Sequence, residues 1–528
     1  MLRLTFHGAA RCVTGSCYRL ETDHGQLLVD CGLFQGPKTE KELNYRPFPF
    51  EPDQIAAVIL SHAHIDHSGL LPKLTRHGFR GAIHATPATA DLAAVMLPDS
   101  AYIQEMEVEQ LNKRNARRNR PEVEPIYRMA DAMAAIEQFD TVDYGTWFEP
   151  LPGVRARFWN AGHLLGSASI EVEAKDGERT VRILFSGDIG PDYKLLQPDP
   201  TGPSDLDFVL CESTYGDRDR IDATAENRRR LLRDEVRAAI NPKGALLIPS
   251  FAVERAQELV SDLMQLMREG ELPEIPVIVD SPLATKATKV FAAHAADLEG
   301  GDELVRGLRS RTVRFTQTVD ESKALDRRDG FHIVIAASGM CEAGRIRHRL
   351  KNWIWREEAT VLLVGFQAEG TLGRILKDGA DEVRIQGDTF KVRARIRTID
   401  LYSGHADGPE LAAWIEKRMP IRHQLFLVHG EATGMAGLAA RVADKLPPDR
   451  VVMPAIDQSF ALTPTGAEPL AEAPPLPRLA PEQVARRDSH NDEARLMLDI
   501  GDALEVAADE KARAVIIRRL RRALEEAR

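Results

Sequence analysis

Four potential metal ligands lie within six residues of one another: His62, His64, Asp66 and His67. They follow residues 56–60, an apolar run typical of a buried strand, so the ligands would emerge in the loop at the end of that strand. Imidazole and carboxylate groups suit zinc, iron or manganese, and the alternate spacing lets His62 and His64 point one way while Asp66 and His67 turn elsewhere. The pattern therefore favours two metal half-sites in one loop over a histidine-rich surface turn.

Other residues that could bind metal stand at or near the ends of further apolar runs: Asp30, Asp188, Glu212 and His429. His163 stands alone in a glycine-bounded loop, where a histidine is more often structural. Ligand-type residues at several strand ends are what a layered sheet with its site along one edge would produce. Asp30, just before Gly32, either braces a metal-binding histidine through a hydrogen bond or caps a turn.

The length and composition describe a globular protein of at least two folded units, because 528 residues exceed one ordinary hydrophobic core. Hydrophobic residues make up 43% of the chain and charged residues 28%. The net charge of -11 argues against non-specific coating of DNA or RNA. It leaves a nuclease possible, because metal ions can supply the positive charge that meets a phosphate.

Five cysteines, odd in number and scattered, do not form a disulfide framework, and reduced thiols are expected. The first residues lack the basic-then-apolar pattern of a signal peptide, and no run of 18 apolar residues occurs. We therefore expect a soluble, cytoplasmic protein with no membrane partner.

From about residue 217 the pattern changes to strands that alternate with helices, which predicts a parallel sheet covered on both faces. The earlier pattern returns near residue 390, so this Rossmann-like region looks like an insertion into one domain. Such sheets bind ligands at the ends of their strands. The candidate substrate contacts there are small residues with free backbone N–H groups and one arginine: Ser250, Ser281, Ser338, Gly339 and Arg345. No glycine-rich phosphate loop follows these strands, which argues against a nucleotide cofactor.

Several motifs together resemble the metallo-β-lactamase superfamily. They are Asp-Cys-Gly-Leu-Phe-Gln-Gly at 30–36, Ser-His-Ala-His-Ile-Asp-His-Ser-Gly at 61–69, Glu-Ser-Thr-Tyr-Gly at 212–216 and Ser-Gly-His-Ala-Asp at 403–407. With the insertion, the set resembles the β-CASP branch of nucleic-acid hydrolases. It is closest to bacterial relatives of the endonuclease subunit of the eukaryotic cleavage and polyadenylation factor. Gly404 stands where that subunit has alanine, a departure that we expect to matter little.

The resemblance covers residues 1–460 and implies an α/β, four-layered αββα metallo-β-lactamase fold with an inserted Rossmann-like β-CASP domain and a helical C-terminal tail. The expected domains are 1–208 and 389–461 for the two parts of the metallo-β-lactamase domain, 209–388 for the β-CASP domain, and 462–528 for a linker and the helical tail.

The resemblance also implies two zinc ions per chain. One would be held by His62, His64 and His163, the other by Asp66, His67 and His429, with Asp188 bridging them and Asp30 as a bracing residue. A hydroxide between the ions would attack a phosphodiester. The expected catalytic residues are Asp66, Glu212 and His405, in which His405 is the general acid and Glu212 orients it. Ser403 is a further candidate substrate contact.

A histidine at position 429 accompanies RNA substrates in this family, so we expect a zinc-dependent ribonuclease, an endonuclease, an exonuclease or both, that acts on single-stranded RNA. The tail is expected to pack either on the body or on a neighbouring subunit, and in the second case the chain would form a homodimer. The alternatives are a DNA nuclease of the same family, a small-molecule metallo-hydrolase of the glyoxalase or lactonase type, and a catalytically silent scaffold. The insertion and the residues Glu212 and His405 argue against the second, and seven filled ligand positions argue against the third.

Overall fold

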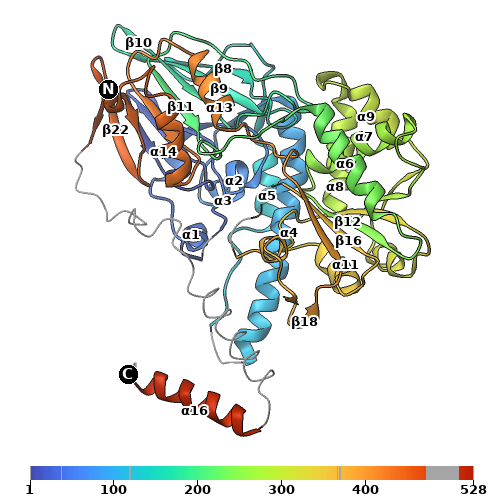
Figure 1. Ribbon diagram of the computed structural model, residues 1–528. Coiled ribbons are helices and arrows are strands. Elements are labelled where there is room, and N and C mark those ends of the chain that lie inside the picture. The colour runs from blue at the N-terminus through green and yellow to red at the C-terminus, as the bar shows by residue number, and fades with distance from the viewer. Residues whose placement is uncertain are drawn as a thin grey trace.

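The computed structural model describes residues 2–36, 38–117, 121–365, 367, 370–470 and 510–526. Two β-sheets form the body of the molecule (Figure 1). In order, the strands of the first sheet are β23 (Gly466–Pro469), β22 (Gln458–Thr463), β1 (Leu2–Phe6), β2 (Tyr18–Thr22), β3 (Gly25–Val29), β4 (Ile55–Ile59), β5 (Ala82–Ala85) and β6 (Phe139–Thr141). Those of the second are β21 (Val451–Val452), β20 (Leu425–Val428), β11 (Phe208–Glu212), β10 (Arg179–Phe185), β9 (Ala168–Asp176), β8 (Val154–Asn160) and β7 (Phe148–Leu151).

Alternation along the strands divides the apolar side chains between two layers of core. In β3, Leu27 and Val29 lie in the core between the sheets, whereas Leu28 lies in the core under the helices of the first sheet. In β20, Phe426 packs between the sheets, where its ring centroid is 5.1 Å from that of Phe6 on β1. Because successive side chains of a strand point to opposite faces, both faces of each sheet are apolar and both must be covered.

Helices cover the outer faces and complete four layers. The helices α3 (Leu71–Arg76), α4 (Pro87–Arg117) and α5 (Met129–Ile136) pack on the first sheet. The helices α13 (Gly408–Glu416) and α14 (Ala432–Arg441) pack on the second. The predicted αββα architecture is therefore confirmed.

The inserted domain is built on a parallel sheet. Its strands, in order, are β14 (Val313–Phe315), β13 (Val277–Val279), β15 (His332–Ala336), β12 (Ala245–Pro249), β16 (Thr360–Val364) and β19 (Arg395–Ile399). One face carries α6 (Ala225–Ala239), α7 (Arg255–Arg268) and α8 (Pro282–Ala293), and the other carries α11 (Ile346–Trp353) and α12 (Leu372–Lys377). Further elements are α9 (Gly301–Leu308), α10 (Val319–Ala324) and the hairpin of β17 (Glu382–Ile385) and β18 (Asp388–Lys391). The Rossmann-like insertion is thus confirmed.

The two domains share an apolar contact along α4, which runs between them (Figure 1). Phe291 of α8 lies in the same buried cluster as Leu92 and Leu97 of α4. Through this contact the inserted domain packs against the two-sheet body.

Sheet pairing corrects the expected domain boundaries. Strand β11, at residues 208–212, pairs with β10 and β20 of the body, so the insertion begins after Glu212 rather than at 209. Strand β19, at residues 395–399, pairs with β16, so the insertion extends past 388. Both strands lie where the chain passes from one domain to the other. The sequence of each is compatible with a strand of either sheet, so it does not indicate the domain.

The expected linker also begins later than residue 462. Strands β22 and β23 form a hairpin that ends at Pro469, and β22 pairs with β1 at the edge of the first sheet. The apolar side chains Phe460 and Leu462 are buried there, which stabilises strand over linker. The predicted linker residues 471–482, and the tail as far as 509, lie outside the described residues. Residues 510–526 form the helix α16 (Glu510–Glu526), as the predicted helical tail requires.

Candidate metal centre

The histidine-rich loop begins at the end of β4. His62 follows the strand by three residues, His64 precedes the short helix α2 (Ile65–Ser68), and this helix carries Asp66 and His67. The helix turns Asp66 and His67 away from the preceding extended residues, so the loop presents candidate ligands in two directions.

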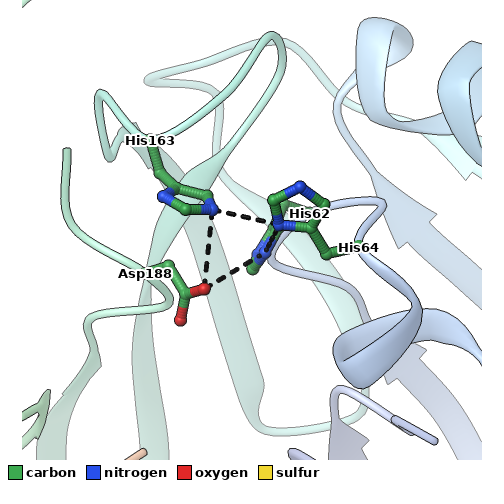
Figure 2. A group of neighbouring side chains, drawn as sticks. All are labelled: His62, His64, His163 and Asp188. Carbon is green, nitrogen blue, oxygen red and sulfur yellow. Dashed lines mark hydrogen bonds and ion pairs between the residues drawn. The ribbon is translucent and has the colours of Figure 1, made fainter. Parts of the chain in front are cut away.

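Three imidazole nitrogens and one carboxylate oxygen converge in a first group (Figure 2). His64 Nδ1 lies 3.2 Å from His62 Nε2 and 3.0 Å from His163 Nε2. Asp188 Oδ2 lies 3.5 Å from His62 Nε2 and 3.6 Å from His163 Nε2. Two nitrogens bound to one tetrahedral zinc are about 3.4 Å apart, given Zn–N distances of about 2.0–2.1 Å. This group therefore has the dimensions of a single metal site.

A second group adjoins the first. His67 Nε2 and His429 Nε2 are 3.1 Å apart, and Asp66 Oδ2 lies 3.6 Å from His429 Nε2. Asp188 Oδ1 is 3.3 Å from His67 Nε2 and 3.5 Å from His429 Nε2. Asp188 thus directs one carboxylate oxygen to each group. Its Oδ1 is buried and accepts no hydrogen bond from the part of the chain that the structure describes.

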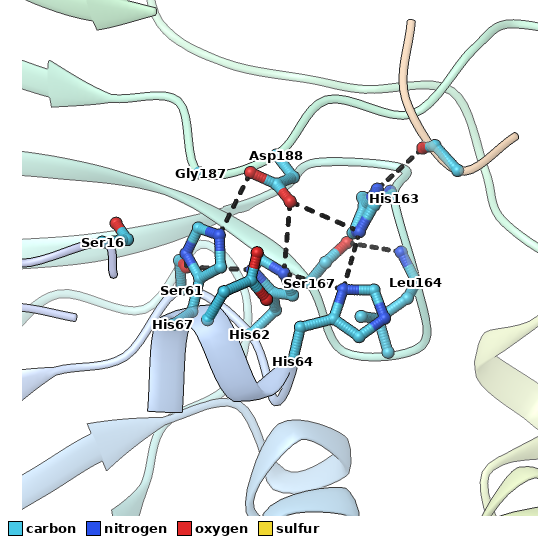
Figure 3. A network of polar contacts seen from close by, with 12 residues as sticks. Ser16, Ser61, His62, His64, His67, His163, Leu164, Ser167, Gly187 and Asp188 are labelled. Atoms are coloured by element: carbon cyan, nitrogen blue, oxygen red, sulfur yellow. Dashed lines mark hydrogen bonds and ion pairs between the residues drawn. The ribbon is translucent and has the colours of Figure 1, made fainter. Parts of the chain in front are cut away.

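Hydrogen bonds behind the rings fix their orientation (Figure 3). Asp30 Oδ2 accepts a hydrogen bond of 2.7 Å from His67 Nδ1. The hydroxyls of Ser16 and Ser61 donate to the same oxygen at 3.1 and 3.0 Å. His163 Nδ1 donates to the Gly404 carbonyl at 2.7 Å. In both histidines the outer nitrogen is engaged, which leaves Nε2 to face the metal position.

Burial favours the neutral form of the three imidazoles in the first group. Burial lowers the pKa of His62 and of His163 well below the usual histidine range, and it lowers the pKa of His64 to about 4. Burial also acts on His67, but the carboxylates of Asp188 and Asp30 outweigh it and raise the His67 pKa. Metal binding requires neutral imidazoles, and the lowered pKa values of His62, His64 and His163 favour that state, whereas His67 would lose a proton when a metal binds.

His405 and Glu212 lie beside these groups. His405 Nδ1 is 3.1 Å from Glu212 Oε2 and 3.2 Å from Oε1, and Glu212 is fully buried. Glu212 Oε1 also accepts a hydrogen bond of 2.6 Å from the Ile189 N–H. The other ring nitrogen, His405 Nε2, is 3.9 Å from Asp188 Oδ2. His405 therefore presents Nε2 to the metal groups and is held from behind by a carboxylate.

The structure gives the expected substrate contacts other roles. Ser281 accepts a hydrogen bond from Ala284 N and caps α8, while Ser338 accepts from the N–H groups of residues 342 and 343. Arg345 pairs with the buried carboxylate of Asp280 at 3.0 Å. These side chains are engaged within the inserted domain, because strand-end residues also cap the helices that follow.

The remaining three candidates differ in their access to a ligand. Ser250 is buried and donates to the Phe251 carbonyl at 3.1 Å. Ser403 accepts a 3.4 Å hydrogen bond from the N–H of His405 and so lies next to the metal groups. Gly339 is buried beside Phe251, whose side chain is exposed. The bracing serines Ser16 and Ser61 were not predicted, although Ser61 directly precedes His62 in the sequence.

Two groups of candidate ligands that share one aspartate, at the edge of a four-layered αββα fold, are the arrangement of a metallo-hydrolase. Family models agree with this class along the chain. The metallo-beta-lactamase superfamily matches residues 10–250, the Beta-Casp domain matches 256–376, and the Zn-dependent metallo-hydrolase RNA specificity domain matches 389–454.

Curated relatives cover most of the chain. A ribonuclease from Thermus thermophilus is 34% identical over 84% of this chain and 96% of its own length. An RNase J-like protein from Methanocaldococcus jannaschii is 31% identical over 82% of this chain and 93% of its own. The transcription termination factor FttA from Methanosarcina mazei is 28% identical over 84% of this chain and 69% of its own.

The chain therefore belongs to the β-CASP family of RNA nucleases within the metallo-β-lactamase superfamily, as the resemblance predicted, and it is a metal-dependent nuclease. Among the described residues, no helix is long and apolar enough to cross a membrane.

Proposed function

We propose that the protein is a two-zinc ribonuclease that hydrolyses phosphodiester bonds of single-stranded RNA. The observation that carries the proposal is the position of Asp188, whose two carboxylate oxygens face two separate groups of histidines beside the His405–Glu212 pair. A single carboxylate between two imidazole groups could hold one metal ion in each group.

The donor set fits zinc. Five imidazoles and two carboxylates supply nitrogen and oxygen ligands: His62, His64, His67, His163, His429, Asp66 and Asp188. The buried Asp188 Oδ1 that lacks a hydrogen-bond donor in the described chain is explained if a cation occupies the second group. Two bound zinc ions would activate a water for attack and neutralise charge on the phosphate.

The residues themselves direct the proton transfers. Asp66, whose carboxylate is 20% exposed, faces solvent and can accept a hydrogen bond from the attacking water. The water's oxygen forms a bond to phosphorus as one of its protons passes to Asp66, and the bond from phosphorus to the 3' oxygen breaks. The leaving oxygen takes a proton from His405 Nε2, while Glu212 stabilises the protonated ring through Nδ1.

RNA is the proposed substrate because a relative at 34% identity is named a ribonuclease and one at 31% is named RNase J-like, and because the RNA specificity domain matches residues 389–454. The test compares matched single-stranded RNA and DNA with protein that carries two equivalents of zinc. We expect RNA cleavage to be faster by at least about 10-fold. Equal cleavage, or faster DNA cleavage, would reject RNA as the substrate.

We also propose a cytoplasmic location and a homodimer. All five cysteines are free and buried, as suits a reducing compartment. The helix α16 exposes the apolar residues Val515 and Ile517, which a second copy could cover. Light scattering on the full chain and on a chain that ends at residue 470 tests the dimer. A dimer that persists without the tail would reject this role of α16.

A further inference from the structure

The general acid stands in a segment without regular secondary structure. Residues 400–407 connect β19 to α13 and include His405. A general acid must present one nitrogen to the leaving oxygen at hydrogen-bond distance, so the backbone that carries it must be fixed. The Glu212 contact holds the ring at Nδ1 but leaves the backbone of His405 to other residues.

Arg220 supplies a contact to that backbone. Its guanidinium Nη1 donates to the His405 carbonyl at 2.7 Å and to the hydroxyl of Tyr193 at 3.0 Å. Its own backbone N–H donates to Asp407 Oδ2 at 2.7 Å, two residues beyond His405. Arg220 thus connects the loop after β11, the loop after β10 and the segment that carries the general acid.

The same arginine also positions an aromatic neighbour of His405. The Arg220 guanidinium carbon lies 4.7 Å from the centroid of the Tyr215 ring. Tyr215 in turn meets the His405 ring edge-on, with centroids 6.0 Å apart and planes at 82°. A cation over an aromatic face is attractive, so the charge that holds the His405 carbonyl also holds the ring packed against its imidazole.

We propose that Arg220 is a positioning residue for the general acid: it fixes the backbone and the packing of His405 so that Nε2 meets the leaving oxygen. The inference rests on the proposed function. Arg220 contacts none of the seven metal ligands in the hydrogen bonds and ion pairs described above, so its loss should weaken proton transfer and leave metal binding intact.

Leaving-group dependence separates this role from a merely structural one. The 3' oxygen of a ribose is a poor leaving group and needs a proton, whereas p-nitrophenolate leaves without one. The experiment measures zinc content and kcat/KM on single-stranded RNA and on thymidine 5'-p-nitrophenyl phosphate. For Arg220→Ala we expect two zinc ions, a fall of about 10- to 100-fold on RNA, and a fall of less than about threefold on the nitrophenyl ester.

Controls tell this inference apart from the proposed function. His405→Ala should show the same selective loss on RNA, larger in size. If His405→Ala loses both substrates equally, the proposed general acid is wrong. Arg230→Ala removes an exposed arginine of α6 that contacts Asp234 of its own helix, and should leave both rates unchanged.

Other outcomes for Arg220→Ala overturn the inference. These are loss of zinc, an equal fall on both substrates, or a rise in KM with unchanged kcat, which would indicate a substrate contact. If the alanine variant does not fold, Arg220→Lys serves instead, because an ammonium lacks the planar guanidinium that lies over the Tyr215 ring and its fixed donor directions. We expect its RNA-to-ester ratio to fall by about threefold or more, and an unchanged ratio would overturn the proposal.

Discussion

His405 Nδ1 lies 3.1 Å from Glu212 Oε2, although 193 residues and the inserted domain separate the two in the sequence. Glu212 is the last residue of β11, and the Ile189 N–H holds its Oε1, so the carboxylate has a fixed position from which to orient the ring. The pair determines which imidazole nitrogen is left to act, and four of the substitutions below test it or the metal groups next to it.

Replacing His405 by alanine should preserve both zinc ions and lower kcat on single-stranded RNA by about 100- to 10,000-fold, the usual range for a general acid. The ring contributes to neither of the two ligand groups of the proposed centre. Zinc analysis and RNA cleavage on the same sample check this prediction. Zinc content that falls together with activity would show that His405 is a metal ligand.

Glu212→Gln should lower kcat on RNA by about 10-fold or more, because the neutral amide no longer stabilises the protonated ring of His405. The amide keeps the shape of the buried side chain and can still accept from the Ile189 N–H. Circular dichroism and zinc content should therefore match the unmodified protein. Full activity in Glu212→Gln would mean that the charge of Glu212 plays no part.

His62→Ala should weaken zinc binding by about 10-fold or more, because it removes a nitrogen from the first group. Competition with a chelator of known affinity measures the change. His84→Ala is a matched control: this histidine contacts Asp140 on β6, away from the seven proposed ligands, and zinc affinity should be unchanged. Two zinc ions retained at full affinity in His62→Ala would reject the assignment of this ligand.

Gly404→Ala should weaken zinc at the first group by about 10-fold. A Cβ atom at residue 404 would lie 2.9 Å from His163 Cε1, so the ring or the loop must move. The departure from the family motif at this residue, which the sequence suggested to be minor, therefore bears on a proposed ligand. An unaltered zinc affinity in Gly404→Ala would show that the loop relaxes without moving His163.

The buried carboxyl of Glu254 predicts a pH dependence of stability. Burial raises its pKa from 4.5 to about 7 despite Lys194 at 3.6 Å. The folded protein then retains a proton that the unfolded chain loses between pH 4.5 and 7, so the free energy of unfolding falls as pH rises through that range. The contribution is at most about 3 kcal/mol.

Glu254→Gln removes this titration, so its melting temperature relative to the unmodified protein should rise between pH 5 and 8. Thermal unfolding of both proteins at each pH measures the difference. A difference that stays constant, or that changes in the opposite direction, would contradict the raised pKa.

Part of the centre could be predicted from the sequence because its spacing is local. His62, His64, Asp66 and His67 share one loop, and their types alone indicate two half-sites. The partners His163 and His429 come from loops of other strands, up to 362 residues from His67, and only the family motifs joined them to it. The alternation of strands and helices likewise predicted the inserted parallel sheet.

Contacts that depend on loop geometry could not be predicted. No spacing in the sequence indicates that Arg220 donates to the His405 carbonyl, or that Ser16 and Ser61 donate to Asp30. Each of these contacts joins loops that only the fold brings together. The expectation that ligands bind at strand ends also pointed to Ser281 and Arg345. In the structure Ser281 caps a helix and Arg345 pairs with Asp280. A position at a strand end predicts where a residue lies in the fold, but the contacts of its side chain depend on the helix that follows.

The most direct test of the account is the chemistry of the ends that the zinc-loaded protein leaves on single-stranded RNA. Water that attacks phosphorus, with a proton given to the 3' oxygen by His405, produces a 5'-phosphate and a 3'-hydroxyl. We predict these ends on end-labelled RNA from the unmodified protein and their loss in His405→Ala. No cleavage by protein with two bound zinc ions, or products with a 2',3'-cyclic phosphate, would contradict it.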